Sequence, residues 1–304
     1  MKRNALPAIG DELLGFRLVR LLGGTGHARV FLAESTGIAE PPIVLKVSAL
    51  PCPAVDIAAT LRHPNIVPIT ATHWLGRLQV HCMPYIDGGT LSARMREAGT
   101  AGIEPRTAVA IAVGVAEALQ HLHGHGIVHR DVKPSNILLA TDSQPLLFDF
   151  GVASRANDDV PLGGTAAYLA PEHLRAMASP DTSVTGHVDR RSDIYSLGLV
   201  LHEMLVGELP FHPGCPAPSP AMMESMALER SLPVPSLRRR RPNLPRPLDA
   251  IVGKCLAADP SCRYEQAAEL AADLDAFQSG LPLPHATPSR TKRLCRWVAR
   301  RLQA

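Results

Sequence analysis

Apolar, β-prone runs of residues recur along the first part of the chain, which is typical of strands. Residues 16–33 predict two strands around a glycine-containing turn, and residues 43–50 predict a third strand. At least two more strands are expected within residues 65–86. The front of the chain is therefore predicted to be a small, strand-rich unit.

The pattern changes after Asp87-Gly88-Gly89, where apolar residues begin to recur at helical spacing. Residues 106–126 predict a long apolar helix that ends at glycine. Further helices are expected at residues 193–207, 248–257 and 267–277, and short strands at residues 127–129, 137–140 and 145–148. Proline-rich stretches predict loops at residues 210–220 and 233–247 and a terminal linker at residues 281–288. The back of the chain is thus predicted to be larger and mainly helical.

Composition narrows the class of protein. At 304 residues and 46% hydrophobic content, the chain can bury a sizeable core in one large or two small domains. The net charge of +3 is uneven, because residues 291–304 hold five cations and no acid, whereas the rest of the chain holds 26 cations and 28 acids. A nucleic-acid-binding domain is expected to carry its basic charge on the folded body, so no nucleic-acid partner is expected. Six cysteines without a CxxC pair, and no apolar run of ~18 residues, predict a cytoplasmic protein with reduced thiols.

The stretch GIVHRDVKPSNILLA, residues 126–140, carries the strongest chemical signal. It places Asp131, Lys133 and Asn136 among six defined positions, a coincidence that chance rarely produces. Asp149 follows an apolar strand in LLFDFG, 18 positions after Asp131, where a carboxylate has little reason to sit unless it faces a site. Carboxylate and amide oxygens are the ligands that Mg²⁺ prefers, so Asn136 and Asp149 suit a magnesium site.

With these motifs the chain resembles the eukaryotic-type (Hanks-type) protein kinases, specifically the bacterial serine/threonine kinases, over roughly residues 16–277. The resemblance implies an α+β, two-lobed protein-kinase-like fold. It has a small β-rich N-lobe with a shortened helix C and a larger, mainly helical C-lobe. The expected divisions are an N-terminal extension at 1–15, the N-lobe at 16–86, the C-lobe at 87–280, and a proline-containing linker with a basic amphipathic segment at 281–304.

The resemblance implies a catalytic role for four residues. Asp131 accepts the proton of the substrate hydroxyl, and Lys133 contacts the γ-phosphate of ATP. Asn136 and Asp149 ligate Mg²⁺, and Asp149 holds the metal that bridges the phosphates. ATP and Mg²⁺ are therefore the expected cofactors.

The resemblance also implies which residues contact the nucleotide. They come from the glycine loop, the following strand and the hinge in HCMPYIDGGTL, and they are Leu22, Gly23, Val30, Lys46, Met83, Tyr85 and Ile86. Met83 is expected at the back wall of the pocket, and residues 84–86 along the adenine edge.

Three further matches are architectural. By resemblance, Glu172 of Ala170-Pro171-Glu172 pairs with Arg263, and Asp193 caps the backbone of the catalytic loop. Thr165 belongs to a ledge for the substrate and bonds toward Asp131 and Lys133.

The sequence departs from the family at two places. The glycine motif aligns on residues 23–30 and retains only Gly23, because Thr25 and Ala28 replace the second and third glycines. These substituents are expected to crowd the approach of the backbone to phosphate and to weaken nucleotide binding without abolishing it.

The second departure leaves Lys46 without its usual glutamate partner. Only 17 positions separate Lys46 from His63, and Ala54 takes the place of the glutamate. A helix of two to three turns is expected over residues 53–61. Either Asp56 substitutes from this shortened helix, or the lysine finds its counter-anion only in ATP. We favour the second explanation, because Asp is one methylene shorter than Glu.

Residues 291–304 place Leu294, Trp297, Val298 and Leu302 on one helical face with cations around it. This pattern suits peripheral contact with an anionic membrane at the inner surface. A frayed basic tail, or a helix packed on the back half, is the alternative.

The sequence thus predicts an ATP-dependent protein serine/threonine kinase that phosphorylates Ser/Thr hydroxyls of protein substrates in bacterial signalling. The rival interpretation is a kinase-like scaffold with weak or no catalysis, which the altered glycine loop and missing glutamate favour. The substrate, the activating signal and the oligomeric state do not follow from the sequence.

Overall fold

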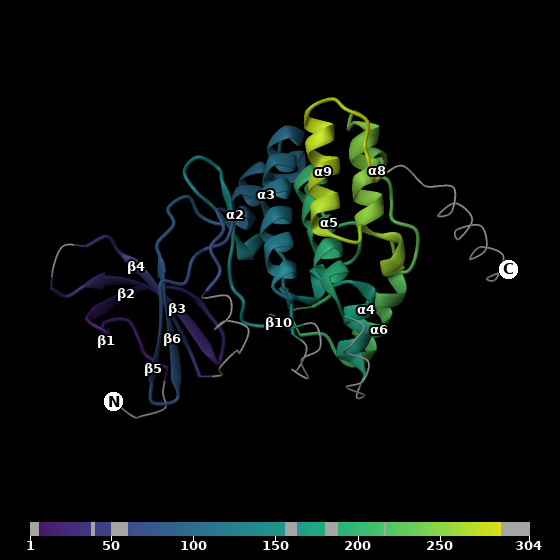
Figure 1. Cartoon of the computed structure of the whole chain (residues 1–304). Coiled ribbons are helices and arrows are strands. Elements are labelled where there is room, and N and C mark those ends of the chain that lie inside the picture. The colour runs from purple at the N-terminus through teal and green to yellow at the C-terminus, as the bar shows by residue number, and fades with distance from the viewer. Residues whose placement is uncertain are drawn as a thin grey trace.

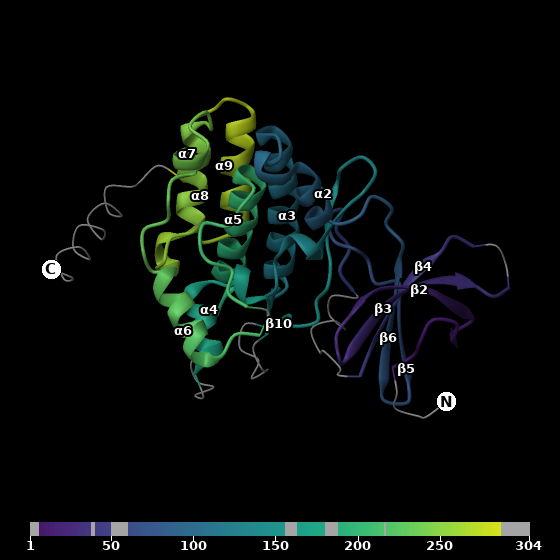
Figure 2. The same cartoon turned by 180° about the vertical axis from the view of Figure 1, so that it is seen from behind.

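The computed structural model describes residues 6–37, 40–49, 60–155, 163–179, 188–215 and 217–286. A strand-rich part and a helical part lie side by side (Figures 1 and 2). The helix expected at residues 53–61, with Ala54 and Asp56, falls mostly outside the described residues, and the segment 291–304 falls outside them entirely.

The N-terminal sheet has six strands in the order β1-β2-β3-β4-β6-β5, and every neighbouring pair is antiparallel. Its strands are β1 (Glu12–Leu13), β2 (Phe16–Gly24), β3 (Ala28–Ser35), β4 (Ile43–Ser48), β5 (Ala71–Leu75) and β6 (Leu78–Pro84). The strands predicted from apolar, β-prone runs are confirmed, and β1 is an addition that the sequence did not indicate.

The register of this sheet separates its two faces. Residues directly opposite one another in neighbouring strands point to the same face. Phe31, Leu45 and Cys82 are opposite one another and join the buried core of the sheet. The next register row holds Val30 and Lys46, and these therefore point to the other face.

The helical part is built around α3 (Pro105–Gly124), whose buried face is almost entirely apolar. Helix α3 packs against α5 (Arg190–Val206) and α9 (Ala267–Gln278), while α8 (Arg246–Cys255) packs on α5 and α9 (Figure 1). The side chain of Glu104 caps α3 by accepting a hydrogen bond from the Thr107 backbone N–H. The helices predicted from apolar periodicity are confirmed.

The structure contains short helices that the sequence pattern did not indicate. They are α2 (Leu91–Ala98), α4 (Pro171–Ala178), α6 (Pro220–Glu229) and α7 (Leu237–Arg240). The predicted loop at residues 233–247 was wrong in part, because α7 lies within it. Ser236 caps α7 and its hydroxyl bonds to Asp249, so a serine after proline-rich sequence starts a helix there.

Short strands follow helix α3 along the chain. They are β7 (Ile127–Val128), β8 (Ile137–Leu139), β9 (Pro145–Leu147) and β10 (Ser154–Arg155), of which the first three were predicted. Ile66 forms a parallel bridge with Leu147, and Asn65 Nδ2 donates to Pro145 O at 2.8 Å. The segment before β5 is therefore held against the β8–β9 hairpin.

No helix within the described ranges combines the length and apolarity that crossing a bilayer requires.

Residues 281–286 follow α9 and pack on the helical part. Leu283 and Ala286 contact its core. The His285 backbone N–H donates to Asp273 Oδ1 at 2.8 Å, and Lys254 Nζ donates to His285 O at 2.6 Å. The start of the expected terminal linker is thus fixed on α8 and α9.

Candidate active site

Asp193, in the first turn of α5, organises the loop between β7 and β8. Its Oδ1 accepts the Arg130 backbone N–H at 2.8 Å, and its Oδ2 accepts the His129 backbone N–H and His123 Nε2, each at 2.9 Å. Burial raises the pKa of Asp193, but the hydrogen bond and charge of His123, with His129, outweigh it and leave the pKa below its ordinary value. The predicted capping of this loop by Asp193 is confirmed.

The loop backbone is held in an uncommon conformation. Arg130 has a φ of 66°, in the left-handed region that non-glycine residues rarely adopt. Such a conformation persists only where surrounding contacts fix it, and the bond from Arg130 N–H to Asp193 is one of these contacts. The strain directs the next residue, Asp131, away from the path of a regular strand.

Asp131 accepts hydrogen bonds from three sides. Its Oδ1 accepts the Thr165 backbone N–H at 2.8 Å. Its Oδ2 accepts Lys133 Nζ at 2.7 Å and Asn136 Nδ2 at 2.9 Å. Lys133 Nζ also donates to Thr165 Oγ1 at 2.6 Å. The predicted contact of Thr165 with Asp131 and Lys133 is confirmed, and the carboxylate has one fixed orientation.

Asn136 and Asp149 lie at the same end of the β8–β9 hairpin. Ile137 is opposite Leu147, so Asn136 directly precedes this pair and Asp149 follows it by two residues. The Phe148 backbone N–H donates to Asn136 O at 3.1 Å, which continues the pairing toward Asp149. Because Asn136 uses its amide nitrogen for Asp131, its amide oxygen is the group that remains suited to a hard cation.

Lys46 pairs with Asp149, and this corrects the explanation that we favoured from the sequence. Lys46 Nζ lies 2.5 Å from Asp149 Oδ1. The side chain of Lys46 is 15% exposed and that of Asp149 is 39% exposed. The expectation that Lys46 finds its anion only in ATP was wrong, because the protein itself supplies a carboxylate from 103 residues away in sequence. Asp56, the other candidate, lies outside the described residues.

The surroundings of Asp149 keep it charged. Burial raises its pKa, but the charge and hydrogen bond of Lys46, followed by the charges of His129 and Lys133, outweigh burial and hold the pKa below its ordinary value. Asp149 also has a φ of 66°, a second strained residue in the same site. The site therefore holds a preformed carboxylate next to a preformed ammonium.

The glycine loop is a tight hairpin between β2 and β3. The Thr25 backbone N–H donates to Ala28 O at 2.7 Å, and Thr25 Oγ1 accepts the backbone N–H of Ala28 at 3.2 Å. A Cβ on Gly24 would lie 2.8 Å from Ala28 O, so this close turn requires glycine there. Thr25, which replaces a family glycine, thus bonds within the turn itself.

The residues expected to contact nucleotide are partly brought together. Gly23 is opposite Val30, and Val30 is opposite Lys46, so these three form one row on the same face of the sheet. Met83 is opposite Val44, two residues from Lys46, and shares that face. Leu22 is 41% exposed at the start of the turn. Tyr85 and Ile86 follow β6 and are half-buried.

The connection from β6 to α2 is attached to the β8–β9 hairpin. The Leu139 backbone N–H donates to Gly89 O at 2.9 Å, and Thr90 bridges to Leu138. Gly88 has a φ of 137°, and a Cβ there would lie 2.1 Å from Leu139 O. The connection that follows the strand of Met83 is therefore in contact with the hairpin that follows Asn136.

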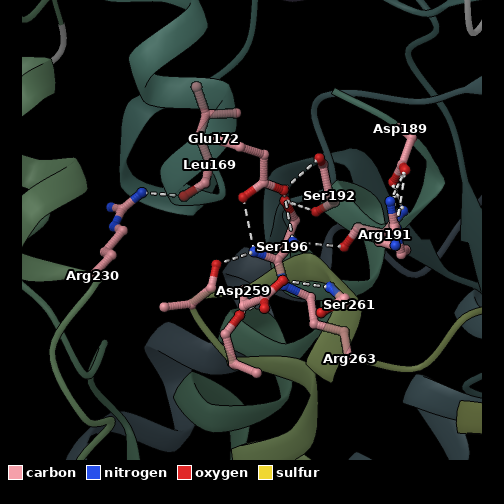
Figure 3. Close-up of polar contacts among 12 residues, drawn as sticks. Leu169, Glu172, Asp189, Arg191, Ser192, Ser196, Arg230, Asp259, Ser261 and Arg263 are labelled. Atoms are coloured by element: carbon pink, nitrogen blue, oxygen red, sulfur yellow. Dashed lines mark hydrogen bonds and ion pairs between the residues drawn. The ribbon is translucent and has the colours of Figure 1, made fainter. Parts of the chain in front are cut away.

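Glu172, at the start of α4, pairs with Arg263 as predicted (Figure 3). Arg263 NH1 lies 2.7 Å from Glu172 Oε1, NH2 lies 2.8 Å from Oε2, and Ser192 Oγ donates to Oε1 at 2.8 Å. Burial raises the pKa of Glu172, but the hydrogen bond and charge of Arg263 outweigh it and hold the pKa below its ordinary range. The Arg263 guanidinium also lies 4.7 Å from the centre of the Tyr195 ring.

A cavity of about 250 Å³ opens beside the catalytic loop, where Pro134 forms part of its lining. Its wall includes Tyr168, whose hydroxyl donates to Glu203 Oε2 at 2.7 Å. Burial raises the pKa of Glu203, although the Tyr168 hydrogen bond opposes that shift. Glu203 and Tyr168 thus line the same cavity.

Two relationships in this site were not found from the sequence. The Lys46–Asp149 pair joins residues of two separate motifs, and nothing in the spacing of either motif indicates the other. His129 contacts both motifs, because its Nε2 lies 3.2 Å from Phe148 O and its ring lies 5.3 Å from that of Phe150. His129 and Phe150 are part of the two motifs in the sequence, but the sequence did not indicate that they are in contact.

Comparison with known proteins agrees with this geometry. The family described as "Protein kinase domain" matches residues 54–273. Serine/threonine-protein kinase PknB of Mycobacterium leprae is 38% identical over 237 residues, covering 74% of this chain and 35% of that protein. Serine/threonine-protein kinase PknJ of Mycobacterium tuberculosis is 34% identical over 278 residues, covering 86% of this chain and 45% of that protein. The chain therefore spans less than half the length of these curated relatives.

A solved structure is similar over nearly the whole fold. The crystal structure of the Mycobacterium tuberculosis PknI kinase domain superposes with a TM-score of 0.65 and 27% sequence identity. The superposition covers 89% of this chain and 99% of that one. The two-part architecture, with an antiparallel sheet beside a helical body, is thus shared with a solved kinase domain.

Proposed function

This chain belongs to the protein kinase domain family, and we propose that it is an Mg²⁺-ATP-dependent protein serine/threonine kinase acting on protein substrates. The observation that carries this proposal is the fixed Asp131 carboxylate. Thr165, Lys133 and Asn136 hold it from three sides, next to the hairpin end that bears Asp149. Such a constellation orients a hydroxyl and accepts its proton.

The reaction assigns one task to each group. The acceptor oxygen forms a bond to the γ-phosphorus as the bond to the β,γ-bridging oxygen breaks, and the hydroxyl proton passes to Asp131. Lys133, bonded to both Asp131 and Thr165, places a cation beside the transferred group. Lys46 supplies a second cation for the phosphates once it exchanges its contact with Asp149 for one with the nucleotide.

The donor set of the hairpin end fits Mg²⁺, which neutralises phosphate charge when it is bound. Asp149 is a carboxylate with a lowered pKa, and Asn136 is oriented by its bond to Asp131. Both are oxygen ligands of the kind that hard cations prefer. We assign Asn136 and Asp149 to the metal and the row Gly23, Val30 and Lys46, with Leu22, Met83, Tyr85 and Ile86, to the nucleotide.

The lobe assignment is part of the proposal. We assign residues 16–86 to the N-lobe and residues 87–280 to the C-lobe, because the sheet ends with β6 and the helices begin with α2. Strand β1, from the segment before residue 16, adds an edge strand to the N-lobe sheet. The rival interpretation as a kinase-like scaffold gains no support, since the relatives named above are serine/threonine-protein kinases.

Label transfer tests the function. Purified wild type and Asp131→Asn are incubated with Mg²⁺, γ-labelled ATP and a generic basic protein acceptor, and the labelled residues are identified after acid hydrolysis. Phosphoserine or phosphothreonine from the wild type is expected, with about 10²–10⁴-fold less from Asp131→Asn. Equal transfer by both proteins, or none by either, would contradict the proposal.

The finer proposal for residues 291–304 is peripheral contact with an anionic membrane. It is supported by the apolar helical face and the five cations of this segment. The test compares the full chain with a chain that ends at residue 286 for co-sedimentation with phosphatidylserine vesicles. Equal sedimentation of the two would remove the membrane contact.

A further inference from the structure

Arg230 is a buried cation with an unusual set of contacts. It caps the C-terminal end of α6 and is 1% exposed. Its guanidinium donates to Leu169 O, and its NH2 donates to Ala167 O at 3.0 Å (Figure 3 shows the contact with Leu169). Both acceptors are backbone carbonyls, and no carboxylate of the described residues forms an ion pair with it.

Such burial is expensive, because an arginine cannot release its proton and buried charge requires compensation. Burial lowers the pKa of Arg230, which reflects this cost. The neighbouring residues of α6, Met226 and Ala227, join an apolar cluster with Leu169 and Leu174. Packing alone would favour another apolar side chain at position 230, so its charge and its forked donors need a separate explanation.

The two carbonyls belong to the substrate ledge, defined here as residues 165–169. The 3-10 turn η3 (Ala166–Tyr168) forms its centre. Ser196 Oγ donates to Tyr168 O at 2.7 Å, so side chains from α5 and α6 bind three consecutive carbonyls, at residues 167, 168 and 169. These side-chain contacts from two helices fix the position of the turn.

The ledge begins at Thr165, which contacts the catalytic groups directly. The Thr165 backbone N–H donates to Asp131 at 2.8 Å, and its hydroxyl accepts from Lys133 at 2.6 Å. A displacement of the turn by less than an ångström would lengthen both bonds. A continuous path thus runs from the buried end of α6 through η3 to Asp131.

We propose that Arg230 is a positioning residue that holds the substrate ledge in register with Asp131 by bridging the carbonyls of Ala167 and Leu169. The inference rests on the proposed kinase function. It assigns Arg230 to the acceptor side of the reaction, because its contacts reach the ledge and lie apart from the sheet row of Gly23, Val30 and Lys46.

The test uses the full chain with Arg230→Met, Arg230→Lys and a matched control, Arg175→Met. Arg175 lies on α4, which packs on α6, and its NH2 donates to Ser231 Oγ at 2.7 Å at the exposed rim of the same interface. The control therefore removes an arginine hydrogen bond beside Arg230 without touching the ledge carbonyls. Three quantities are measured: kcat/KM for the basic protein acceptor, the Kd of Mg²⁺-ATP by calorimetry, and the melting temperature.

Arg230→Met is expected to lower kcat/KM for the acceptor at least tenfold while the Kd of ATP stays within twofold of wild type. Arg230→Lys is expected to lose less kcat/KM than Arg230→Met, because one ammonium can bind one carbonyl but cannot bridge two. Arg175→Met is expected to match wild type. A kcat/KM within twofold of wild type for Arg230→Met overturns the inference, as does an equal loss of acceptor turnover and ATP binding.

The design separates two kinds of failure. Absence of transfer by the wild type refutes the proposed function, whereas an active wild type with equally active Arg230 variants refutes only the role of Arg230. If Arg230→Met has no cooperative melting transition, the same two quantities are compared for Arg230→Lys. A kcat/KM of Arg230→Lys equal to that of wild type then counts against the inference.

Discussion

Lys46 and Asp149 form an ion pair that joins strand β4 of the sheet to the segment after the β8–β9 hairpin, with Lys46 Nζ 2.5 Å from Asp149 Oδ1. Each residue is therefore a counter-ion of the other within the protein itself. A bound phosphate must compete with Asp149 for the lysine, and a bound cation must compete with Lys46 for the carboxylate.

This competition predicts that Asp149→Asn changes the affinity for ATP in opposite directions with and without Mg²⁺. Without the carboxylate, Lys46 is free for phosphate, so ATP in the presence of EDTA should bind more tightly than it binds to wild type. Binding of Mg²⁺-ATP should weaken about ten- to hundredfold, since a charge-assisted contact of about 1.5–3 kcal/mol is lost on the cation side. Isothermal calorimetry with and without Mg²⁺ measures both, and weakening under both conditions would mean that the pair does not compete with ligand.

Asp56→Ala is expected to leave the affinity for Mg²⁺-ATP nearly unchanged. Lys46 already has a carboxylate partner in Asp149, so the lysine is not expected to depend on Asp56. The same calorimetric titration measures it, with Lys46→Met as the variant that should lose affinity. A tenfold loss for Asp56→Ala would instead assign Asp56 to the lysine.

The Glu172–Arg263 pair predicts a strong dependence of stability on both partners. The side chains are 12% and 0% exposed, so removing one leaves a buried charge without compensation. Arg263→Met should lower the free energy of unfolding by about 3–5 kcal/mol, and Glu172→Gln combined with Arg263→Met should recover part of that loss. Urea unfolding followed by circular dichroism measures these values; additive losses in the double variant would show that the two residues do not interact.

Asp193 predicts part of the loss of stability in acid. Its pKa in the folded protein lies below the usual value of 3.8, so its contribution is complete above that pH and is lost as the pH falls through 3.8 toward the folded value. Asp193→Asn should be less stable than wild type at pH 7 and should show a shallower decline below about pH 4. Glu97→Gln, at a side chain that is 72% exposed, serves as the control and should follow the wild-type curve.

Gly88 and Gly89 offer a matched pair for the connection between the lobes. Both have positive φ, but a Cβ on Gly88 would lie 2.1 Å from Leu139 O, whereas a Cβ on Gly89 meets nothing within 4 Å. Gly89→Ala should cost roughly 1–2 kcal/mol of unfolding free energy from backbone strain alone. Gly88→Ala should cost about 1–3 kcal/mol more, because the hairpin must shift. Equal losses in thermal unfolding would show that the contact with Leu139 is not limiting.

The elements that the sequence predicted well are those with a clear apolar pattern. The strands from Phe16 to Pro84 were indicated by apolar runs, and the helices α3, α5, α8 and α9 by apolar spacing. The helices that the pattern did not indicate are short and polar or follow prolines, as α6 does at Pro220. In such segments capping by a single serine, here Ser219, decides the start of the helix, and hydrophobic periodicity carries little information.

Contacts between distant motifs were predicted only where the family resemblance supplied the pairing. The family resemblance indicated that Asp193 caps the loop and that Glu172 pairs with Arg263, and both are present. The pair Lys46–Asp149 depends on how the sheet is placed relative to the hairpin, which no local pattern encodes. The two contacts of Arg230 depend in the same way on the seating of α6 against η3.

The contacts of His285 indicate where an expressed fragment of the chain can end. Asp273 is fully buried and accepts both the Tyr264 hydroxyl at 2.7 Å and the His285 backbone N–H at 2.8 Å, while Lys254 reaches the carbonyl of the same histidine. A fragment that ends at residue 280 would lack the His285 backbone N–H that donates to the buried Asp273 carboxylate. It would also lack Leu283, which packs on the apolar core. The shortest stable catalytic fragment is thus expected to extend through residue 286.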